Sequence, residues 1–172
     1  QAEHAPRAAV FLITPDKDFG LAVQKEMEKQ MKELSRYEIM KSSVDQYAKA
    51  FLCKDAEQCF DIVNKIAPEH LEVELPDPKK YLPLIYNAGA IFLGKFTSEP
   101  IGDYMAGPNH TLPTSGTAAF SSPLGVYDFV KHSSVECYSE EAFRKISKKV
   151  QLFAKAEGLT AHAHAMEVRD ED

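Results

Sequence analysis

The chain has 172 residues, of which 44% are hydrophobic and 27% are charged, the balance of a globular protein with an apolar core. Its formal net charge is −6 and it has no basic run interleaved with aromatic residues, which argues against nucleic-acid binding. The longest apolar run, residues 8–13, is too short to cross a bilayer, so no membrane partner is expected. The three cysteines lack CxxC spacing, which argues against a disulfide framework and favours the reducing cytoplasm.

Strand and helix patterns alternate along the first half of the chain. Short apolar runs predict buried strands at residues 8–14 and 90–93 and a further strand at 50–54. At residues 71–75 (LEVEL), apolar and acidic residues alternate, which predicts a strand with one face in water. Helical periodicity predicts a helix after Asp16, with an apolar face of Phe19, Val23, Met27, Met31 and Leu34, and further helices at residues 55–66 and 77–85. This alternation indicates an α/β layer with parallel strands.

The character of the sequence changes after residue 94. Residues 102–118 (GDYMAGPNHTLPTSGTA) hold three glycines and two prolines, which argue against a helix or a central strand and predict an irregular loop. We expect a short helix at residues 123–131, a strand at 133–138, and then a long helix. That helix is capped by Ser139, ended by Gly158, and has an apolar face of Phe143, Ile146, Val150 and Phe153. The predicted domains are therefore residues 1–122, and a small, mostly helical segment at 123–172.

Two adjacent residues, Glu69 and His70, lie where a predicted helix meets a predicted strand. Both side chains can reach into one pocket as an acid and a base with different intrinsic pKa values. The alternative is a surface turn with a solvated glutamate and a partly buried histidine. The two residues by themselves do not decide between these interpretations.

Two further segments carry candidate side chains. Asp103 and His110 share the glycine-rich loop, but their spacing fits no local helical metal motif, so the loop either binds a ligand or forms a tight corner. Glu157 and His162 either complete a site or stand exposed in a polar tail. Composition and spacing thus predict a soluble α/β chain with a metal or acid–base site, and they leave the reaction open.

Six sequence motifs occur in a specific order along the chain: QAEH, APEHLEV, NAGAIFLG, EPIGDYMAGPNHTLPT, SSPLGVYDFVK and AEGLTAHA. Together they closely resemble the C-terminal part of the histidinol dehydrogenase family, over residues 1–169. The resemblance implies oxidation of L-histidinol through L-histidinal to L-histidine, in histidine biosynthesis, with two molecules of NAD. It also implies a zinc-dependent, cytoplasmic homodimer built partly on incomplete Rossmann-like α/β domains, with the 123–172 segment serving dimerisation.

The resemblance also carries site residues over to this sequence. The positions that match the family's zinc ligands are Gln1, His4, Asp103 and His162, of which His162 would come from the partner subunit. Glu69 and His70 match the acid–base pair. The substrate-contacting positions comprise His110, Glu157, His70 and the four zinc ligands. Oxygen and nitrogen donors with open coordination positions suit a metal that binds substrate directly.

Family members are much longer than this chain, and their upstream half carries most of the NAD contacts. We therefore expect a fragment that holds the zinc and acid–base residues but is a poor dehydrogenase, with its NAD-contacting residues unknown. One alternative is a truncated, non-catalytic homologue that acts as a dimerising or ligand-binding module. A weaker alternative is a metal-assisted hydrolase in which Glu69 activates water without any hydride acceptor.

Overall fold

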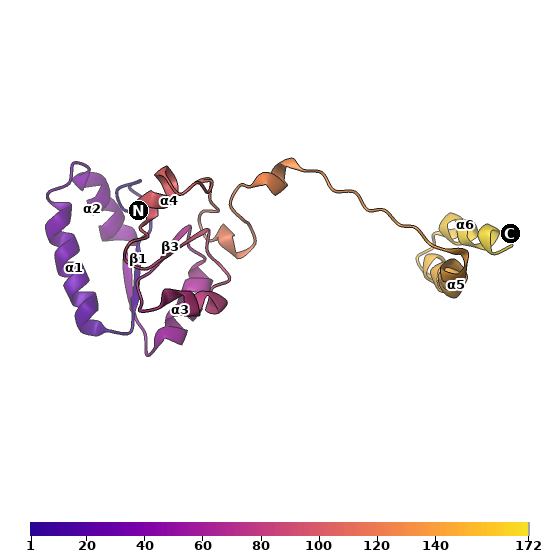
Figure 1. The fold of residues 1–172 in the computed structure, drawn as a ribbon, viewed down its shortest axis with the longest axis horizontal. Coiled ribbons are helices and arrows are strands. Elements are labelled where there is room, and N and C mark those ends of the chain that lie inside the picture. The colour runs from indigo at the N-terminus through magenta and orange to yellow at the C-terminus, as the bar shows by residue number, and fades with distance from the viewer. Residues whose placement is uncertain (172) are drawn as a thin grey trace. The chain divides into compact units, whose positions relative to one another are not determined.

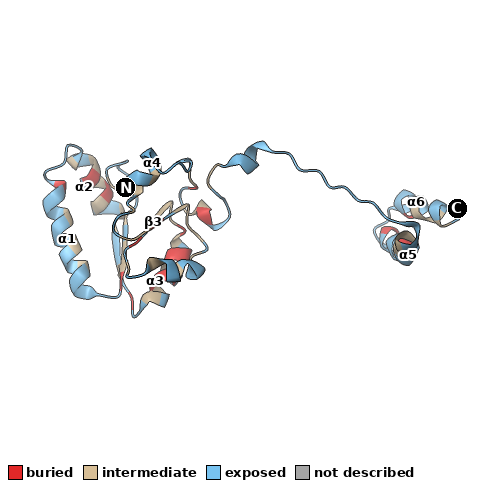
Figure 2. Ribbon diagram, in the orientation of Figure 1, coloured by how far each residue is buried: buried red, intermediate tan, exposed pale blue. Residues whose placement is uncertain are grey.

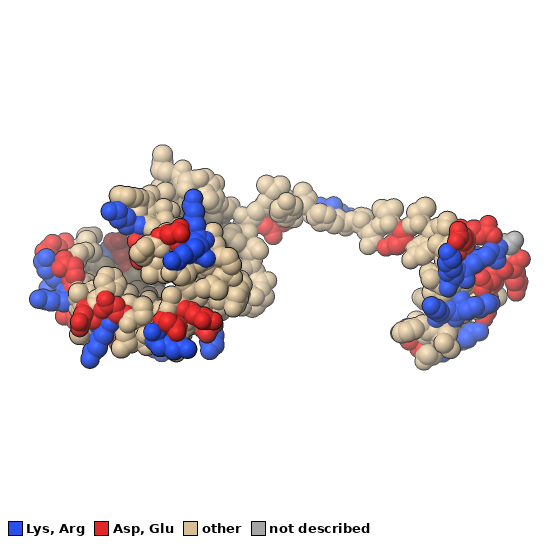
Figure 3. Space-filling model, turned by 60° about the horizontal axis from the view of Figure 1, so that its bottom comes forward, with Lys and Arg blue, Asp and Glu red and all other residues tan. Residues whose placement is uncertain are grey.

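The computed structural model describes residues 1–171 and divides into two units, Gln1–Phe129 and the part from Val130 onward (Figure 1). The domain boundary predicted between residues 122 and 123 lies slightly earlier, and it stays a prediction. Within the described residues, no helix is both long and apolar enough to span a membrane. Acidic and basic side chains are interspersed on the face of each unit drawn in Figure 3.

The first unit begins with a parallel pair of strands, β1 (Phe11–Thr14) and β2 (Lys49–Leu52). Two helices connect them, α1 (Lys17–Met31) and α2 (Tyr37–Tyr47). Helix α2 was not predicted, because Arg36 at its N-terminus makes no side-chain capping bond and so provides no start signal. A tertiary contact holds it instead: the hydroxyl of the fully buried Ser43 donates to the carbonyl oxygen of Ala8 at 2.7 Å.

A second parallel pair of strands, β3 (His70–Val73) and β4 (Ala90–Leu93), follows helix α3 (Ala56–Ile66). The segment between the strands, predicted as a helix, is the 3-10 helix η1 (Pro78–Leu84). One face of β3 packs on α3 through a core cluster made of Phe60, Val63, Leu71 and Val73. Buried residues concentrate on α3 in Figure 2, and the predicted α/β class with parallel strands is confirmed.

The apolar face predicted for the first helix is only partly correct. Met31 is buried, and Val23 and Met27 are half-buried. Helix α1 ends at Met31, so Leu34 lies outside it, and the Phe19 side chain at its start is 52% exposed. The buried stripe is therefore shorter than the periodicity indicated.

The region after β4 departs from the predictions at four places. Residues 102–104 belong to helix α4 (Glu99–Tyr104) and not to a loop, because Pro100 lies in the first turn, where its missing N–H breaks no helical bond. Residues 117–119 form the 3-10 helix η2 (Thr117–Ala119). The helix predicted at residues 123–131 is the short 3-10 helix η3 (Val126–Phe129). The strand predicted at 133–138 is wrong, since no described segment pairs with these residues.

The second unit consists of α5 (Glu140–Ala156) and α6 (Thr160–Glu171). Ser139 caps α5 as predicted, accepting from the Ala142 amide at 3.2 Å, and Gly158 follows the helix at a φ of 77°. No separate helix was predicted for the residues of α6, where His162 was expected either to complete a site or to stand exposed in a polar tail. Packing against α5 supports α6 as a helix.

Candidate functional site

Glu69 lies in the turn between α3 and β3, and His70 is the first residue of β3. Ala67, in the left-handed region at a φ of 48°, ends α3. The carbonyl of Glu69 accepts a hydrogen bond from the Ala90 amide at 2.8 Å. A Cβ at Gly89 would lie 2.6 Å from this carbonyl oxygen, so only glycine permits such a close approach. The backbone of the predicted acid–base pair is therefore tightly packed against β4.

The side-chain amide of Gln1 bridges the predicted acid–base pair. Its Oε1 lies 2.9 Å from Nδ1 of His70, and its Nε2 donates to Oε2 of Glu69 at 3.4 Å. An amide oxygen only accepts hydrogen bonds, so Nδ1 of His70 carries the hydrogen in this contact. In the neutral ring, Nε2 is then the unprotonated nitrogen that can accept a proton.

His70, Glu99 and Asp103 form a compact group of possible metal ligands. One ligand atom from each residue lies within 4.8 Å of the other two, and Nε2 of His70 is 3.7 Å from Oε1 of Glu99. Burial and the neighbouring Asp103 carboxyl raise the pKa of Glu99, while His70 and the N-terminal amine oppose this rise. One nitrogen and two carboxylate oxygens at this separation suit a divalent cation such as zinc.

A cavity of about 470 Å³ adjoins this group. Asp103 and His110 both line it, so the structure brings these two predicted residues to one space. The remaining wall is mostly apolar and includes Phe92, Ile101 and Leu124. A mainly apolar cavity with a few polar groups is the common form of a small-molecule site.

Other predicted residues lie outside this group. His4 is exposed in the N-terminal turn, where its amide donates to the Gln1 carbonyl at 3.1 Å. Glu157 and His162 belong to the second unit, at the end of α5 and on the exposed side of α6. The first unit thus contains five of the eight predicted site residues near the cluster or its cavity: Gln1, Glu69, His70, Asp103 and His110.

Glu99 was not among the predicted site residues. A signal for it exists, because Ser98 followed by Glu99 and Pro100 is typical of a helix start, and Asp103 then follows Glu99 by one helical turn. Because residues 102–118 were predicted as a separate loop, the one-turn spacing between Glu99 and Asp103 was not recognised.

Cys53 and Cys59 are not part of this ligand group. Cys53 and Cys59 are both buried. Burial, together with the neighbouring Cys53, raises the pKa of Cys59 to about 12, so its thiol stays protonated at neutral pH.

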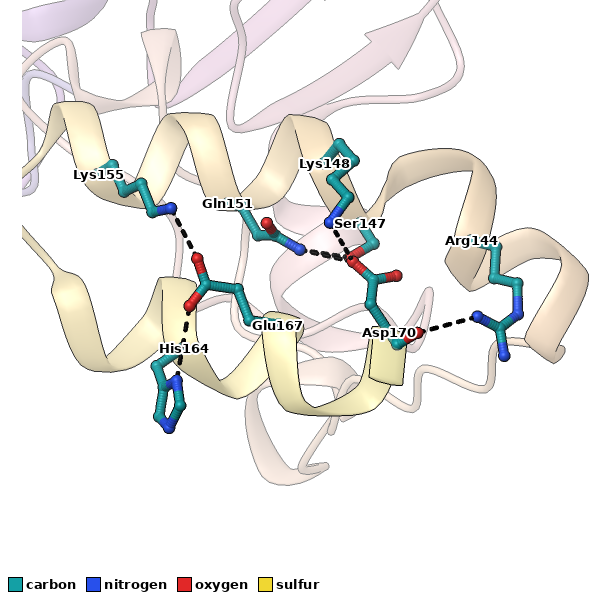
Figure 4. Close-up of polar contacts among 8 residues, drawn as sticks. All are labelled: Arg144, Ser147, Lys148, Gln151, Lys155, His164, Glu167 and Asp170. Carbon is teal, nitrogen blue, oxygen red and sulfur yellow. Dashed lines mark hydrogen bonds and ion pairs between the residues drawn. The ribbon is translucent and has the colours of Figure 1, made fainter. Parts of the chain in front are cut away.

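Polar side chains join the two helices of the second unit (Figure 4). The Asp170 carboxylate accepts from the Ser147 hydroxyl and the Gln151 amide, both at 2.7 Å, and pairs with Lys148 at 3.1 Å. These contacts lower the pKa of Asp170, with the Ser147 hydrogen bond as the largest cause. The register of α6 on α5 is thus held by directional hydrogen bonds.

Comparison with known proteins identifies the family. The family model described as histidinol dehydrogenase matches residues 1–170. The chain is 49% identical to histidinol dehydrogenase of Aquifex aeolicus and 50% identical to that of Listeria monocytogenes serovar 1/2a, each over 172 residues that make up 40% of the relative. The crystal structure of histidinol dehydrogenase from Elizabethkingia anophelis matches with a TM-score of 0.88 at 33% identity, over 99% of this chain and 39% of that one. The chain spans about 40% of the length of these relatives, and it belongs to the histidinol dehydrogenase family.

Proposed function

We propose that this chain supplies the zinc-binding and acid–base residues of an enzyme that oxidises L-histidinol through L-histidinal to L-histidine, with NAD as hydride acceptor. The observation that carries the proposal is the convergence of Gln1, Glu69, His70 and Asp103 in the first unit of a chain that belongs to this family. A homodimer and a cytoplasmic location are part of the same proposal.

The proposed zinc ligands are Gln1, His4, Asp103 and, across the dimer, His162 of the partner subunit. Of these ligands, Asp103 offers a carboxylate oxygen, a donor type that zinc accepts, and it lies beside His70 and Glu99, which are not among the proposed ligands. Zinc, when bound, would hold the nitrogens of histidinol and orient its alcohol carbon.

His70 is the proposed base for the alcohol proton. Its Nδ1 contacts the Gln1 amide oxygen, so Nε2 is available to take the proton as hydride leaves the alcohol carbon. Glu69 would then activate the water that attacks the aldehyde before the second oxidation. His110, on the wall of the cavity, and Glu157 are proposed substrate contacts, with the Glu157 carboxylate suited to the substrate ammonium group.

NADH formation tests the activity directly. The purified chain is mixed with zinc, NAD and L-histidinol, alone and together with the upstream half of a family enzyme. Turnover that needs the upstream half would support a dehydrogenase divided between the two parts. No turnover in either mixture would favour the non-catalytic, dimerising or ligand-binding module.

Changing Asp103 to alanine tests the zinc assignment. We expect Asp103→Ala to weaken zinc binding by more than about 100-fold, because a direct ligand matters more than the outer-shell groups whose loss costs about 10–100-fold. Competition with a chromogenic chelator measures this affinity. The exposed Asp61 on α3 offers a matched control, and equal zinc affinity in Asp103→Ala and Asp61→Ala would refute the assignment.

A further inference from the structure

Helix α4 carries both Glu99 and Asp103, yet its own sequence provides no side-chain cap. It has six residues, and the side chain of Ser98 at its N-cap position makes no capping hydrogen bond. A helix this short is not stable in isolation, because helix nucleation is unfavourable and few hydrogen bonds follow it. Something outside α4 must therefore hold it in place.

Glu72 on strand β3 provides the missing cap. Its Oε1 accepts a hydrogen bond from the backbone amide of Glu99 at 2.9 Å. This amide is one of the free donors of the first helical turn, and a carboxylate beside it is also favoured by the helix dipole. We propose that Glu72 is a positioning residue, which caps α4 from β3 and so holds Glu99 and Asp103 opposite His70.

The sheet fixes where this cap is placed. His70 and Glu72 are two residues apart on β3, so their side chains leave the same face of the strand. Phe92 of β4 is the register partner of Glu72 and supports the other end of α4. A Cβ at Gly102 would lie 2.6 Å from the Phe92 ring, so α4 rests directly on this ring. Two points thus determine the position of α4: its capped first turn and its glycine contact.

This arrangement links the cap to the ligand group. Glu99 and Asp103 are one helical turn apart on α4 and therefore share one side of the helix. Their carboxylates meet His70, which comes from the same strand as the capping Glu72. Glu72 is not part of that group and so acts through α4. The proposal rests on the proposed function only in treating Asp103 as a zinc ligand and His70 as the base.

Three variants of the 172-residue chain separate capping from charge. Glu72→Ala removes the acceptor, Glu72→Gln keeps an acceptor oxygen without the charge, and Glu74→Ala removes an exposed carboxylate two residues further along as a control. Two quantities are measured: zinc affinity by chelator competition, and the ring nitrogen chemical shifts of His70 without zinc. The second reports the tautomer and surroundings of the ring, which a general loss of stability would not move while the chain stays folded.

We expect Glu72→Ala to lose about tenfold in zinc affinity, as outer-shell substitutions do, and to shift the His70 ring signals. Glu72→Gln should restore both, and Glu74→Ala should match the original chain. Unchanged zinc affinity and unchanged ring signals in Glu72→Ala would overturn the proposal, as would a Glu72→Gln variant as impaired as Glu72→Ala. If the original chain binds no zinc, the zinc assignment fails, and the metal-free ring signals still decide the role of Glu72.

A double variant keeps the test decisive if Glu72→Ala does not fold. Ser98 already has the extended backbone of an N-cap residue, with φ −82° and ψ 157°, and aspartate is a strong N-cap residue. Adding Ser98→Asp to Glu72→Ala should restore folding and the His70 ring signals, because a local cap replaces the distant one. A folded double variant with displaced ring signals would contradict the proposal.

Discussion

Helices α3 and α5 bury chemically different faces. Helix α3 packs its apolar side, with Phe60 and Val63, against Leu71 and Val73 of β3. Helix α5 buries Ser147, Gln151 and Ala154 against α6, and its Phe153 side chain is 72% exposed. The buried side of α3 is thus apolar, whereas the fully buried residues of α5 are small or polar and its Phe143 and Ile146 are half-buried.

An amphipathic pattern therefore shows which face of a helix can be buried, but it does not show which partner covers that face. The apolar face predicted for α5 is only partly buried: Phe143 and Ile146 are half-buried, whereas Val150 and Phe153 are exposed. The small residues Ala154 and Ala163, both buried, let the two helices approach closely. Polar bonds from Asp170 then hold their register.

The largest expected difference in stability is between two phenylalanine variants, one in α3 and one in α5. Phe60→Ala removes a ring that is 5% exposed, and it should destabilise the first unit by about 3–5 kcal/mol. Phe153→Ala should change the stability of the second unit by less than about 0.5 kcal/mol, because exposed side chains contribute little. Native-state hydrogen exchange resolves the two regions. Similar losses for both variants would break the comparison.

Buried amides give a smaller contrast. Asn64 donates to the Leu84 carbonyl at 2.7 Å and accepts from the Tyr86 amide at 3.0 Å. Asn64→Ala leaves these backbone groups unpaired and should cost about 2 kcal/mol. Gln151→Ala should cost nearer to about 1 kcal/mol, because its partner Ser147 still donates to Asp170. Hydrogen exchange of the same two regions tests the order, and a larger loss for Gln151→Ala would reverse it.

The smallest expected effect is a pH dependence confined to the second unit. Hydrogen bonds from Ser147 and Gln151 and the charge of Lys148 lower the pKa of Asp170 below its usual value. The folded state therefore binds protons less readily than the unfolded state, so this stabilisation is present above about pH 4 and is lost as the pH falls through the lowered pKa. Following the α6 amide signals from pH 6 to pH 3 measures the loss. Asp170→Asn should flatten this dependence, and an unchanged pH profile in that variant would contradict the assignment.

Local signals predicted much of the fold. Asp16, Asp55 and Ser139 each accept a hydrogen bond from an amide three residues later. Each of these helix starts therefore depends on residues within one helical turn and can be predicted from the local sequence. All four strands were predicted, from short apolar runs and from the alternation at residues 71–75, although β2 is mostly exposed. Helix α2 escaped prediction because a distant contact, from Ser43 to Ala8, holds it in place of a cap.

The residues of the candidate site were likewise predicted only in part. Glu69, His70 and Asp103 were recognised from their motif words in the sequence. Glu99 was missed, and the role of Glu72 was not visible, because its carboxylate meets an amide 27 residues further along the chain. Such a contact depends on the pairing of β3 with β4 and on the position of α4 against this pair of strands.

The sequence by itself determined the family, the parallel α/β class and the identity of the groups that can carry chemistry. These depend on residue types and short spacings, which the sequence itself contains. Only the tertiary structure decided that Gln1 bridges Glu69 and His70, that Glu99 joins Asp103, and that α5 buries Ser147 and Gln151. Each of these depends on which distant backbone or helix lies opposite, because a side chain forms its directional bonds with whatever the fold brings within reach.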